Sequence, residues 1–543
     1  MPSLVAVALA VAMTWPLSLH LRTHIAGDLG DPLFFTWQLS WIGHATFGDP
    51  LDLWQANIFW PLPDSLAFTD TLLGYAPAAF LADRGLGKAI ITYNLLLLFA
   101  LALTFLGTYL LARELGTGRL GGLCAGAAFT YAPWLVGHIQ HLPIRSAGGI
   151  PLALYLLVRG YRRRSGRMVL AGWVVAAWQM LLGLALGLSF AYLVAILAVL
   201  AVVLGWRNRR ELLTGGLLTA TIGGVLVLGL ATVLHVFPYL RVTENHPESA
   251  RSIAYVTGLS PTWRGFLAAP EESTVWGDAT ERARAPFRAP SEQSLFPGVT
   301  VLGLAVTGAL GSVYPRRLRR GLVAATVAAA VLSVGIYRED AVTPYRVLYE
   351  LAPGWDAVRT SGRINLLTSL GLALLAAAGV VVVTRWLARR VRGRPRLRTA
   401  PTVVGLALVA AILVEGHGQV WVGDVPEPPA AHEAFGGPRL HLPGDISAFW
   451  ARYIVWSTED LQPIVNGYGS FEPTENLALL ASIEGFPDAE SVERLQEVGV
   501  RTVVLHREFA AGTPWESVVD RPIDDLPLTR EVEPDVIVYR LAP

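Results

Sequence analysis

Long apolar runs alternate with short polar connections along most of the first 420 residues of the chain. A helix needs about 20 mainly apolar residues to cross the roughly 30 Å hydrocarbon layer of a bilayer. Eleven runs come near this length, at residues 3–21, 89–112, 118–136, 146–161, 168–185, 187–206, 214–236, 295–313, 321–337, 364–384 and 401–420. The first run has no basic segment before it, so we interpret it as a retained helix rather than a cleaved signal. The pattern predicts a mainly α-helical, polytopic membrane protein with about eleven transmembrane helices.

The arginine-rich connections all fall on one side of this predicted bundle, at residues 113–119, 159–167, 207–210, 316–320 and 385–398. Short loops with positive charge stay in the cytoplasm, so this side is predicted to be inside. The N-terminus then lies inside as well. The predicted outer regions are residues 22–88, 137–145, 237–294, 338–363 and everything after about 420.

Two stretches of the first predicted outer loop do not fit a full span. Residues 33–47 mix Trp, Phe and His, and residues 71–83 are apolar but short and contain Pro77. Both suit helices that lie at the membrane surface or re-enter the bilayer from one side. The first extracytoplasmic loop is therefore predicted to be long and to carry interfacial helices.

The pattern changes after residue 420, where the Pro-rich linker VPEPPAA leads into shorter mixed segments. Residues 489–498 have a helical pattern, and RTVVLH and DVIVYRL are typical of strands. About 120 residues are enough to bury a separate core. We therefore expect a transmembrane domain at 1–420 and a small extracytoplasmic α/β domain at 421–543.

The composition supports the membrane assignment. Hydrophobic residues make up 53% of the chain and charged residues 16%, with a mean hydropathy of +0.46, whereas soluble domains carry roughly a quarter charged residues. The net charge of +1 argues against binding nucleic acid through bulk charge. Cys124 is the only cysteine, which excludes an intramolecular disulfide framework and disfavours a Cys-rich metal site.

Carboxylates and aromatic residues gather in the first predicted outer loop. Asp28 and Asp31 follow the first span directly, and Asn57, Trp60 and Asp70 come later in the same loop. This mixture suits recognition of sugar hydroxyls together with stacking on sugar rings. Two other interpretations stay open, because an Asp before a Pro is a good helix start and aromatic residues are common at membrane interfaces.

A second polar group forms most of the short loop at 137–145, with His138, Gln140, His141 and Arg145. The two histidines stand three residues apart, so they can share a helix face and bind a metal ion or a phosphate. Arg363, at the outer start of the tenth span, can clamp a phosphate through its fork of donors. The structural alternatives are a polar loop pinned between two helices and an arginine that anchors its helix at the interface.

Four segments of the chain resemble a known family: GDLGDPLFFTWQLSW, ANIFWPLPDSLAFTDTLLG, GHIQHL and ARYIVWSTEDLQPIVNGYGSF. Over most of its length the chain resembles a family of bacterial multi-spanning membrane proteins that is similar to C-type membrane glycosyltransferases, such as protein mannosyltransferases and aminoarabinose transferases. The resemblance implies an enzyme of the cell envelope that moves a sugar from a polyprenyl-phosphate carrier to a hydroxyl of a glycan, lipid or protein acceptor. The reaction would take place at the outer face of the cytoplasmic membrane.

In such enzymes an acidic residue of the first outer loop takes the proton of the acceptor. Asp31 matches that position best, Asp28 is a further carboxylate without an assigned role, and Asp70 stands where related bacterial sequences usually have a Glu. Phosphate is a good leaving group, so the reaction needs a base near the acceptor hydroxyl and positive charge near the phosphate. That charge can come from His138, His141, Arg145 or Arg363, or from a divalent metal ion, which the pattern does not identify.

Two other functions compete with the transferase. A lipid or sugar transporter predicts ionisable residues or broken helices in the middle of spans, and the predicted spans contain few of them. An envelope-assembly scaffold would use the outer domain to bind partners and would tolerate replacement of Asp31. The polar residues gather instead at the outer helix ends, as a one-sided reaction site requires.

The outer domain is expected to pack over the mouth of the first outer loop. Trp456, Asn466 and Tyr468, within one of the resembling segments, would then face that mouth as a lid. The alternative is that these residues only close the core of the small domain itself.

Overall fold

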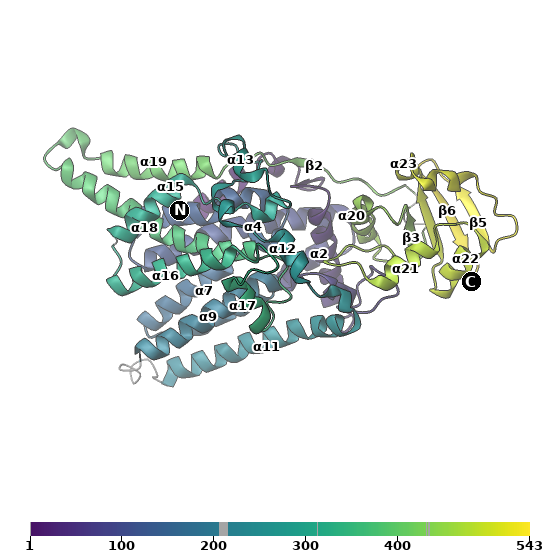
Figure 1. The fold of residues 1–543 in the computed structure, drawn as a ribbon, viewed down its shortest axis with the longest axis horizontal. Coiled ribbons are helices and arrows are strands. Elements are labelled where there is room, and N and C mark those ends of the chain that lie inside the picture. The colour runs from purple at the N-terminus through teal and green to yellow at the C-terminus, as the bar shows by residue number, and fades with distance from the viewer. Residues whose placement is uncertain (1, 206–214, 312, 431, 433–434) are drawn as a thin grey trace. The chain divides into compact units, whose positions relative to one another are not determined.

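The computed structural model describes residues 2–205, 215–311, 313–430, 432 and 435–543. The fold is mainly helical and includes a four-stranded sheet near the C-terminus of the chain (Figure 1). The chain divides into two compact units, each assembled from three segments. The helical unit comprises Met1–Ser18, Leu96–Val233 and Arg251–Trp421, and the mixed unit comprises Leu19–Leu95, Leu234–Ala250 and Val422–Pro543.

Each of the eleven apolar runs in the sequence overlaps a helix in the described part of the chain. These helices are α1 (Pro2–Met13), α4 (Leu86–Glu114), α5 (Gly118–Thr130), α7 (Gly149–Arg162), α8 (Gly166–Met180), α9 (Leu184–Gly205), α11 (Gly215–Asn245), α15 (Val299–Leu310), α16 (Arg316–Ser333), α18 (Asn365–Arg390) and α19 (Ala400–Glu415). Shorter elements connect them, including η1 (Leu17–Leu19), η5 (Pro133–His138), α6 (Leu142–Arg145), α12 (Ile253–Leu259), α13 (Glu281–Arg284), α14 (Pro290–Gln293), α17 (Pro344–Leu351) and η10 (Ser361–Ile364).

Within the described part of the chain, five helical segments are long and apolar enough to cross a membrane: Leu86–Glu114, Leu184–Val203, Gly215–Asn245, Ser361–Arg390 and Pro395–Glu415. Three further apolar helices are shorter, at Pro2–Met13, Leu73–Ala82 and Val299–Leu310. These helices indicate a membrane protein, as predicted. The number of eleven spans and their sidedness stay predictions.

Small residues let α15 and α18 pack closely in the helical unit. A methyl group added at Gly308 would clash with the backbone carbonyl of Leu375, and one added at Gly379 would clash with the carbonyl of Leu304. Close backbone approach at small residues is typical of helix pairs in membranes, where dispersion contacts replace the hydrophobic effect as the driving force. The two glycines therefore fix the distance between these helices.

We expect Gly308→Ala to destabilise the protein by about 1–3 kcal/mol, because the added methyl overpacks the interface between the two helices. Gly303→Ala is a matched control on the same helix, since a methyl there meets no described atom within 4 Å and alanine favours a helix over glycine. Thermal unfolding of the purified protein in detergent measures both changes. Equal melting temperatures for the two variants would contradict the packing argument.

The mixed unit contains a sheet with the strand order β3-β4-β6-β5. Strand β3 (Arg439–Leu442) runs parallel to β4 (Thr502–His506), and β6 (Val536–Leu541) pairs antiparallel with both β4 and β5 (Leu528–Val532). The predicted strands RTVVLH and DVIVYRL are thus confirmed as β4 and β6. All five residues of β4 are buried, as expected for a strand rich in branched apolar residues and covered on both faces.

Three helices accompany this sheet: α20 (Ser447–Trp456), α21 (Thr474–Ser482) and α22 (Ala489–Glu497). Helix α22 confirms the predicted helix at 489–498. It begins with a capping box in which Asp488 accepts a hydrogen bond from the Ser491 backbone and the Ser491 hydroxyl bonds back to the Asp488 backbone. A second, two-stranded antiparallel sheet joins β1 (His24–Ala26) to β2 (Val422–Asp424).

The stretch predicted as an interfacial helix at 33–47 is helical, but its environment differs from the prediction. Helix α2 (Asp31–Phe47) is buried within the mixed unit, with residues 32–43 all buried. A helix that is apolar on all sides requires burial on all sides, and α20 and the segment that follows Leu72 supply much of the cover. The sequence reveals the apolar faces of α2 but not these distant partners.

The other unusual stretch, at 71–83, forms three short helical pieces: η3 (Leu73–Tyr75), α3 (Ala76–Ala79) and η4 (Phe80–Ala82). Ten helical residues extend roughly 15 Å, about half of the hydrocarbon layer. The length agrees with an interfacial or re-entrant segment, and the topology of this stretch stays a prediction.

Two buried histidines lie on neighbouring strands of the four-stranded sheet. His441 on β3 and His506 on β4 share a hydrogen bond of 2.9 Å between Nδ1 and Nε2, and Tyr453 stacks on both rings. Burial lowers the pKa of His506 to about 3, with a smaller contribution from the charge of His432. Burial likewise holds the pKa of His441 well below its usual range. Both rings are therefore neutral at pH 7.

We expect the mixed unit to lose stability as the pH falls from about 6.5 towards 3. Above this range the histidines are neutral in both folded and unfolded chains, whereas inside it only the unfolded chain takes up protons. The loss is about 1 kcal/mol per histidine per pH unit. Melting temperatures recorded between pH 7.5 and 4.5 measure it, with His506→Gln as the comparison. A His506→Gln profile as steep as that of the unchanged protein would contradict the assignment to this ring.

Candidate functional site

Asp31 stands at the start of α2, where the chain turns into the helix. Gly30 precedes the helix, and its N–H donates a hydrogen bond of 2.8 Å to Asp28 Oδ1. The Asp31 carboxylate is half-buried, and its Oδ1 accepts a hydrogen bond of 2.7 Å from the hydroxyl of Tyr468. The exposed N–H groups at a helix N-terminus favour an anion. The structure thus holds one carboxylate of the predicted site in a defined orientation.

The two neighbouring aspartates differ in their surroundings. Asp28 is exposed and closes a local turn on Gly30, whereas Asp31 faces a tyrosine from a distant part of the chain. The ring of Tyr468 also lies 5.4 Å from the ring of Phe34 on α2, which fixes the position of its hydroxyl. Asp31 is therefore oriented by a residue 437 positions away in the sequence.

Asp70 lies in a segment that is hydrogen-bonded to a side chain of α2. The side chain of Gln38 donates a hydrogen bond of 3.0 Å to the backbone carbonyl of Asp70 and accepts one of 3.0 Å from the N–H of Leu72. The hydroxyl of Tyr239 donates to the carbonyl of Thr69 at 2.9 Å. Gln38 stands two helical turns after Asp31, roughly 10 Å along the axis. One helix therefore positions both predicted acidic segments.

Asn57 and Trp60 use their polar atoms inside the mixed unit. The amide of Asn57 accepts a hydrogen bond from Trp37 Nε1 at 2.8 Å and donates to Ser457 Oγ at 3.0 Å. Trp60 Nε1 donates to the carbonyl of Val498 at 2.9 Å. These contacts join residues 57–60 to the C-terminal segment, so both side chains help to hold the mixed unit together. The predicted substrate contact of Asn57 and Trp60 gains no support from them.

The three residues predicted to form a lid divide into two groups. Tyr468 reaches Asp31, as described above. Trp456 Nε1 donates to the carbonyl of Pro426, and the ring packs against His506. The Asn466 side chain bonds both the N–H and the carbonyl of His441. The structure therefore favours the lid interpretation for Tyr468 and the core interpretation for Trp456 and Asn466.

A charged cluster in the helical unit contains three of the predicted residues. His138 and His141 approach at 3.2 Å between their Nδ1 atoms. Arg363 Nη2 donates a hydrogen bond of 2.7 Å to Glu292 Oε1, and Glu292 is only 4% exposed. Glu292 interacts electrostatically with His138 and His141 as well as with Arg363. The structure thus brings His138, His141 and Arg363 together, around a carboxylate that the sequence did not suggest.

The charges in this cluster follow from burial and pairing. Burial alone would raise the pKa of Glu292, but Arg363, with a smaller effect from His138, holds it well below its usual range. Burial lowers the pKa of His138 to about 3, although Glu292 opposes the shift. At pH 7, Glu292 is therefore an anion and His138 is neutral, and Arg363 supplies the balancing positive charge.

Arg145 and Gln140, also predicted to bind substrate, make local contacts. The guanidinium of Arg145 donates to the backbone carbonyls of Leu135 and Thr130, each at 3.2 Å. Burial lowers its pKa to about 10, so it stays charged at neutral pH. Gln140 Nε2 donates to the carbonyl of Gly137 in its own loop at 3.1 Å. Arg145 therefore stabilises the end of α5 and the turn after it, as a structural cation does.

Glu292 is the main site residue that the sequence interpretation missed. It stands in the segment PSEQS, directly before the apolar run that begins at residue 295. Polar residues at the outer ends of predicted spans marked the other candidates, and the same criterion applied here would have found it. Neither cluster has the compact ligand geometry of a metal site. Among the described residues, the His, Cys, Asp and Glu side chains that converge closely enough to share an ion are His246, Glu248 and Glu475.

The structure is similar to that of the arabinofuranosyltransferase AftD from Mycobacteria. The similarity has a TM-score of 0.57 at 17% sequence identity and covers 100% of this chain and 41% of AftD. This chain therefore spans less than half the length of that protein. At this identity the comparison establishes the fold.

Two structures of the oligosaccharyltransferase of Archaeoglobus fulgidus are also similar. One is AglB in complex with an inhibitory peptide and a dolichol-phosphate, with a TM-score of 0.45, 14% identity, and coverage of 94% of this chain and 69% of AglB. The other, in complex with Zn and sulfate, has a TM-score of 0.46, 13% identity, and coverage of 99% and 73%. No family model and no curated protein matches the sequence significantly. The similarity to AftD confirms the predicted resemblance in fold: the chain has the fold of a C-type membrane glycosyltransferase.

Proposed function

We propose that the chain is a membrane glycosyltransferase that transfers a sugar from a polyprenyl-phosphate donor to an acceptor hydroxyl. The observation that carries the proposal is the half-buried carboxylate of Asp31, which Tyr468 orients at the N-terminus of α2. The fold shared with AftD supports the same class of reaction. A scaffold protein has no need for an oriented acidic group at this position.

In the proposed reaction, Asp31 accepts the proton of the acceptor hydroxyl. The acceptor oxygen forms a bond to the anomeric carbon of the sugar as the bond from that carbon to the phosphate oxygen breaks. The polyprenyl phosphate leaves with the electron pair. Because the phosphate is already a weak base, general-base assistance at the acceptor is the step for which a protein carboxylate is most useful.

The leaving phosphate needs hydrogen-bond donors and positive charge. We assign this role to Arg363, His138 and His141. Arg363 lies just before α18, and the two histidines lie in the segment that follows α5. The two imidazoles share one hydrogen bond between their Nδ1 atoms, so an Nε2–H of this pair can serve as a donor, and the guanidinium of Arg363 offers a planar set of donors. Glu292 holds that guanidinium in place through the hydrogen bond from Nη2.

The proposal includes a topology. Eleven spans with the arginine-rich loops in the cytoplasm leave the first loop and residues 421–543, the proposed extracytoplasmic domain, at the outer face of the membrane. Cysteines introduced in 22–88 and 421–543 should then react with a membrane-impermeant label added from outside to intact cells. Reaction only after the cells are opened would contradict the sidedness.

The transferase activity is tested with the purified full-length protein in liposomes. Synthetic polyprenyl-phosphate sugars, pentoses and hexoses in turn, are supplied with a panel of glycan, lipid and peptide acceptors, and release of polyprenyl phosphate is measured. Release with at least one donor and transfer of its sugar support the proposal. Binding of the donors without release from any of them, in protein shown to be folded, would count against it.

Tyr468→Phe should lower turnover about tenfold, because it removes the hydrogen bond to the Asp31 carboxylate, and a bond to a charged group contributes about 1.5 kcal/mol. The phenyl ring keeps the contact with Phe34, so the melting temperature should fall by only a few degrees. The KM for the donor should stay unchanged, since the tyrosine orients the base and not the phosphate. A tenfold rise in KM at constant turnover would instead place Tyr468 on the substrate.

A further inference from the structure

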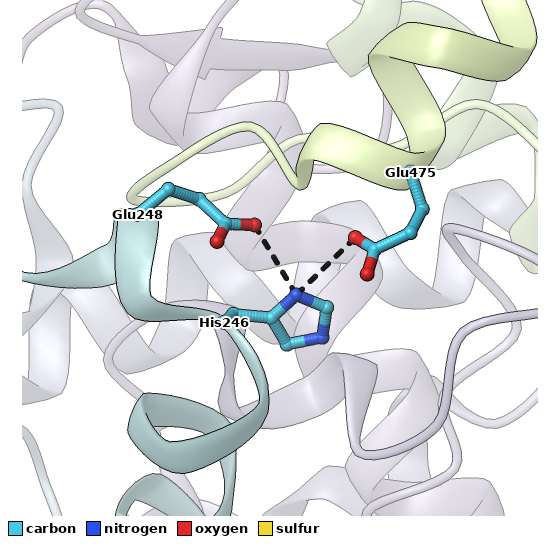
Figure 2. Close-up of side chains that lie close together, drawn as sticks. All are labelled: His246, Glu248 and Glu475. Carbon is cyan, nitrogen blue, oxygen red and sulfur yellow. Dashed lines mark hydrogen bonds and ion pairs between the residues drawn. The ribbon is translucent and has the colours of Figure 1, made fainter.

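One imidazole and two carboxylates converge in the mixed unit (Figure 2). His246 follows the end of α11, Glu248 lies in the turn after it, η7 (Pro247–Ser249), and Glu475 lies in the first turn of α21. Nδ1 of His246 is 3.2 Å from Glu248 Oε1 and 3.5 Å from Glu475 Oε2. One ligand atom from each residue lies within 4.8 Å of the other two.

These distances match the edges of a metal coordination polyhedron. Zinc binds His nitrogen at about 2.0–2.1 Å and carboxylate oxygen at about 2.0–2.2 Å, usually in tetrahedral geometry. Two ligands of such a tetrahedron are separated by about 3.3–3.5 Å, since the edge is roughly 1.6 times the bond length. The nitrogen–oxygen separation to Glu475, 3.5 Å, lies in this range, and the separation to Glu248, 3.2 Å, is 0.1 Å shorter. An ion between the three atoms therefore requires little movement of the side chains.

A single proton on His246 cannot form hydrogen bonds to both carboxylates at once. The two carboxylates approach the same nitrogen atom, Nδ1, which carries at most one hydrogen. That hydrogen can point at Glu248 or at Glu475, and the other carboxylate then lies close to a like charge. A divalent cation interacts with both carboxylates at once and removes this repulsion.

The histidine is also held in place by its neighbours. Its ring is 5% exposed and packs against Phe68, with ring centres 5.1 Å apart, and against Phe471, at 5.8 Å. The N–H of Thr474 donates a hydrogen bond of 3.1 Å to Glu248 Oε1, which orients that carboxylate from outside the site. Glu248 and Glu475 are both exposed, so an ion can enter from water.

We propose that His246, Glu248 and Glu475 bind a divalent transition metal ion, with Zn²⁺ as the best match. A nitrogen donor disfavours Ca²⁺ and Mg²⁺, which take oxygen ligands, and the mixed nitrogen and oxygen set suits zinc. Three protein ligands leave a fourth position for water. The site joins two segments that are 227 residues apart in sequence, counted from Glu248 to Glu475.

The position of the site suggests what the ion does. Phe471 and Ser470 lie between Glu475 and Tyr468 in the sequence, and Ser470 is bonded to the segment that precedes Asp70. Its N–H donates to the carbonyl of Phe68 at 2.9 Å, and its hydroxyl donates to Thr69 Oγ1 at 3.1 Å. The ion would anchor this segment at its far end and restrict the motion of Tyr468. It is a positioning site and takes no part in the bond changes of sugar transfer.

The test uses the full-length protein without an affinity tag, in detergent, stripped with EDTA and dialysed. Titration with ZnCl₂ followed by calorimetry should show one site per chain, and X-ray absorption should show nitrogen and oxygen ligands near 2.0–2.1 Å, including one imidazole. Glu475→Gln should weaken zinc binding at least tenfold. Glu472→Gln, an exposed carboxylate three residues earlier and outside the cluster, should bind zinc as the unchanged protein does.

Two results would overturn the proposal. The first is a folded, unchanged protein that takes up no zinc at 0.1 mM by calorimetry and elemental analysis, which would leave an ion pair alone. The second is equal binding by the unchanged protein and by Glu475→Gln, which would place the ion elsewhere. Hydrogen exchange gives a further readout, because the amides of Ser470 and Thr474 should exchange more slowly with zinc. None of these measurements depends on transferase activity, so the site and the proposed function stand or fall separately.

Discussion

Asp31→Asn is expected to lower the turnover of sugar transfer by roughly 10²-fold or more, the usual contribution of a general base. Asparagine has nearly the same shape and can still accept the hydrogen bond from the Tyr468 hydroxyl, so the fold and the binding of donor should persist. Release of polyprenyl phosphate under saturating donor and acceptor measures the loss. The melting temperature in detergent checks that the variant is folded.

Asp28→Asn is the matched control, because it changes an exposed carboxylate three residues earlier on the same turn. Its amide oxygen can keep the bond from the Gly30 N–H, and we expect less than a threefold change in turnover. If Asp28→Asn is the variant that loses activity while Asp31→Asn keeps it, the base has been assigned to the wrong aspartate. Full activity in both variants would refute a carboxylate base at this turn.

Glu292→Gln should destabilise the helical unit by about 3 kcal/mol, because it leaves the partly buried guanidinium of Arg363 without its counter-charge. Glu350→Gln provides the comparison. It removes the carboxylate of an exposed ion pair with Arg346, and such pairs contribute at most about 0.5 kcal/mol on a helix. Thermal and denaturant unfolding in detergent measure both variants.

The double variant Glu292→Leu with Arg363→Met separates charge from packing. Removing both members of a buried pair is often nearly neutral for stability, whereas removing one is not. We therefore expect the double variant to be more stable than Glu292→Gln, and to lose transferase activity if Arg363 binds the leaving phosphate. A double variant that is no more stable than the single one would show that Glu292 acts through contacts other than this charge pair.

The helices were predictable because their signal is local. The length of an apolar run such as that of α4 or α18 can be counted in the sequence, and the bilayer thickness sets the length that a transmembrane helix needs. The strands β4 and β6 were predictable for the same reason, from short runs of Val, Ile and Leu. Elements of this kind need no knowledge of what they pack against.

The contacts that build the candidate site were not predictable in this way. The neighbourhood of Asn57 in the sequence predicted a sugar ligand. In the structure, however, its side-chain amide donates a hydrogen bond to Ser457, 400 residues later. The burial of α2 depends in the same way on α20. Polar residues that bridge distant segments look the same in a sequence as polar residues that bind a substrate, because only the fold supplies the partner.

The hydrogen bond between Tyr468 and Asp31 also has a consequence for biosynthesis. It joins residues 437 positions apart, and synthesis at 5–20 residues per second separates their appearance by roughly 20 to 90 seconds. During that time α2 has left the ribosome, but α20, which packs against it in the folded protein, has not yet been synthesised. We expect nascent chains to need shielding of this apolar helix, and chains truncated before residue 447 to be removed by proteolysis rather than to accumulate as inactive enzyme.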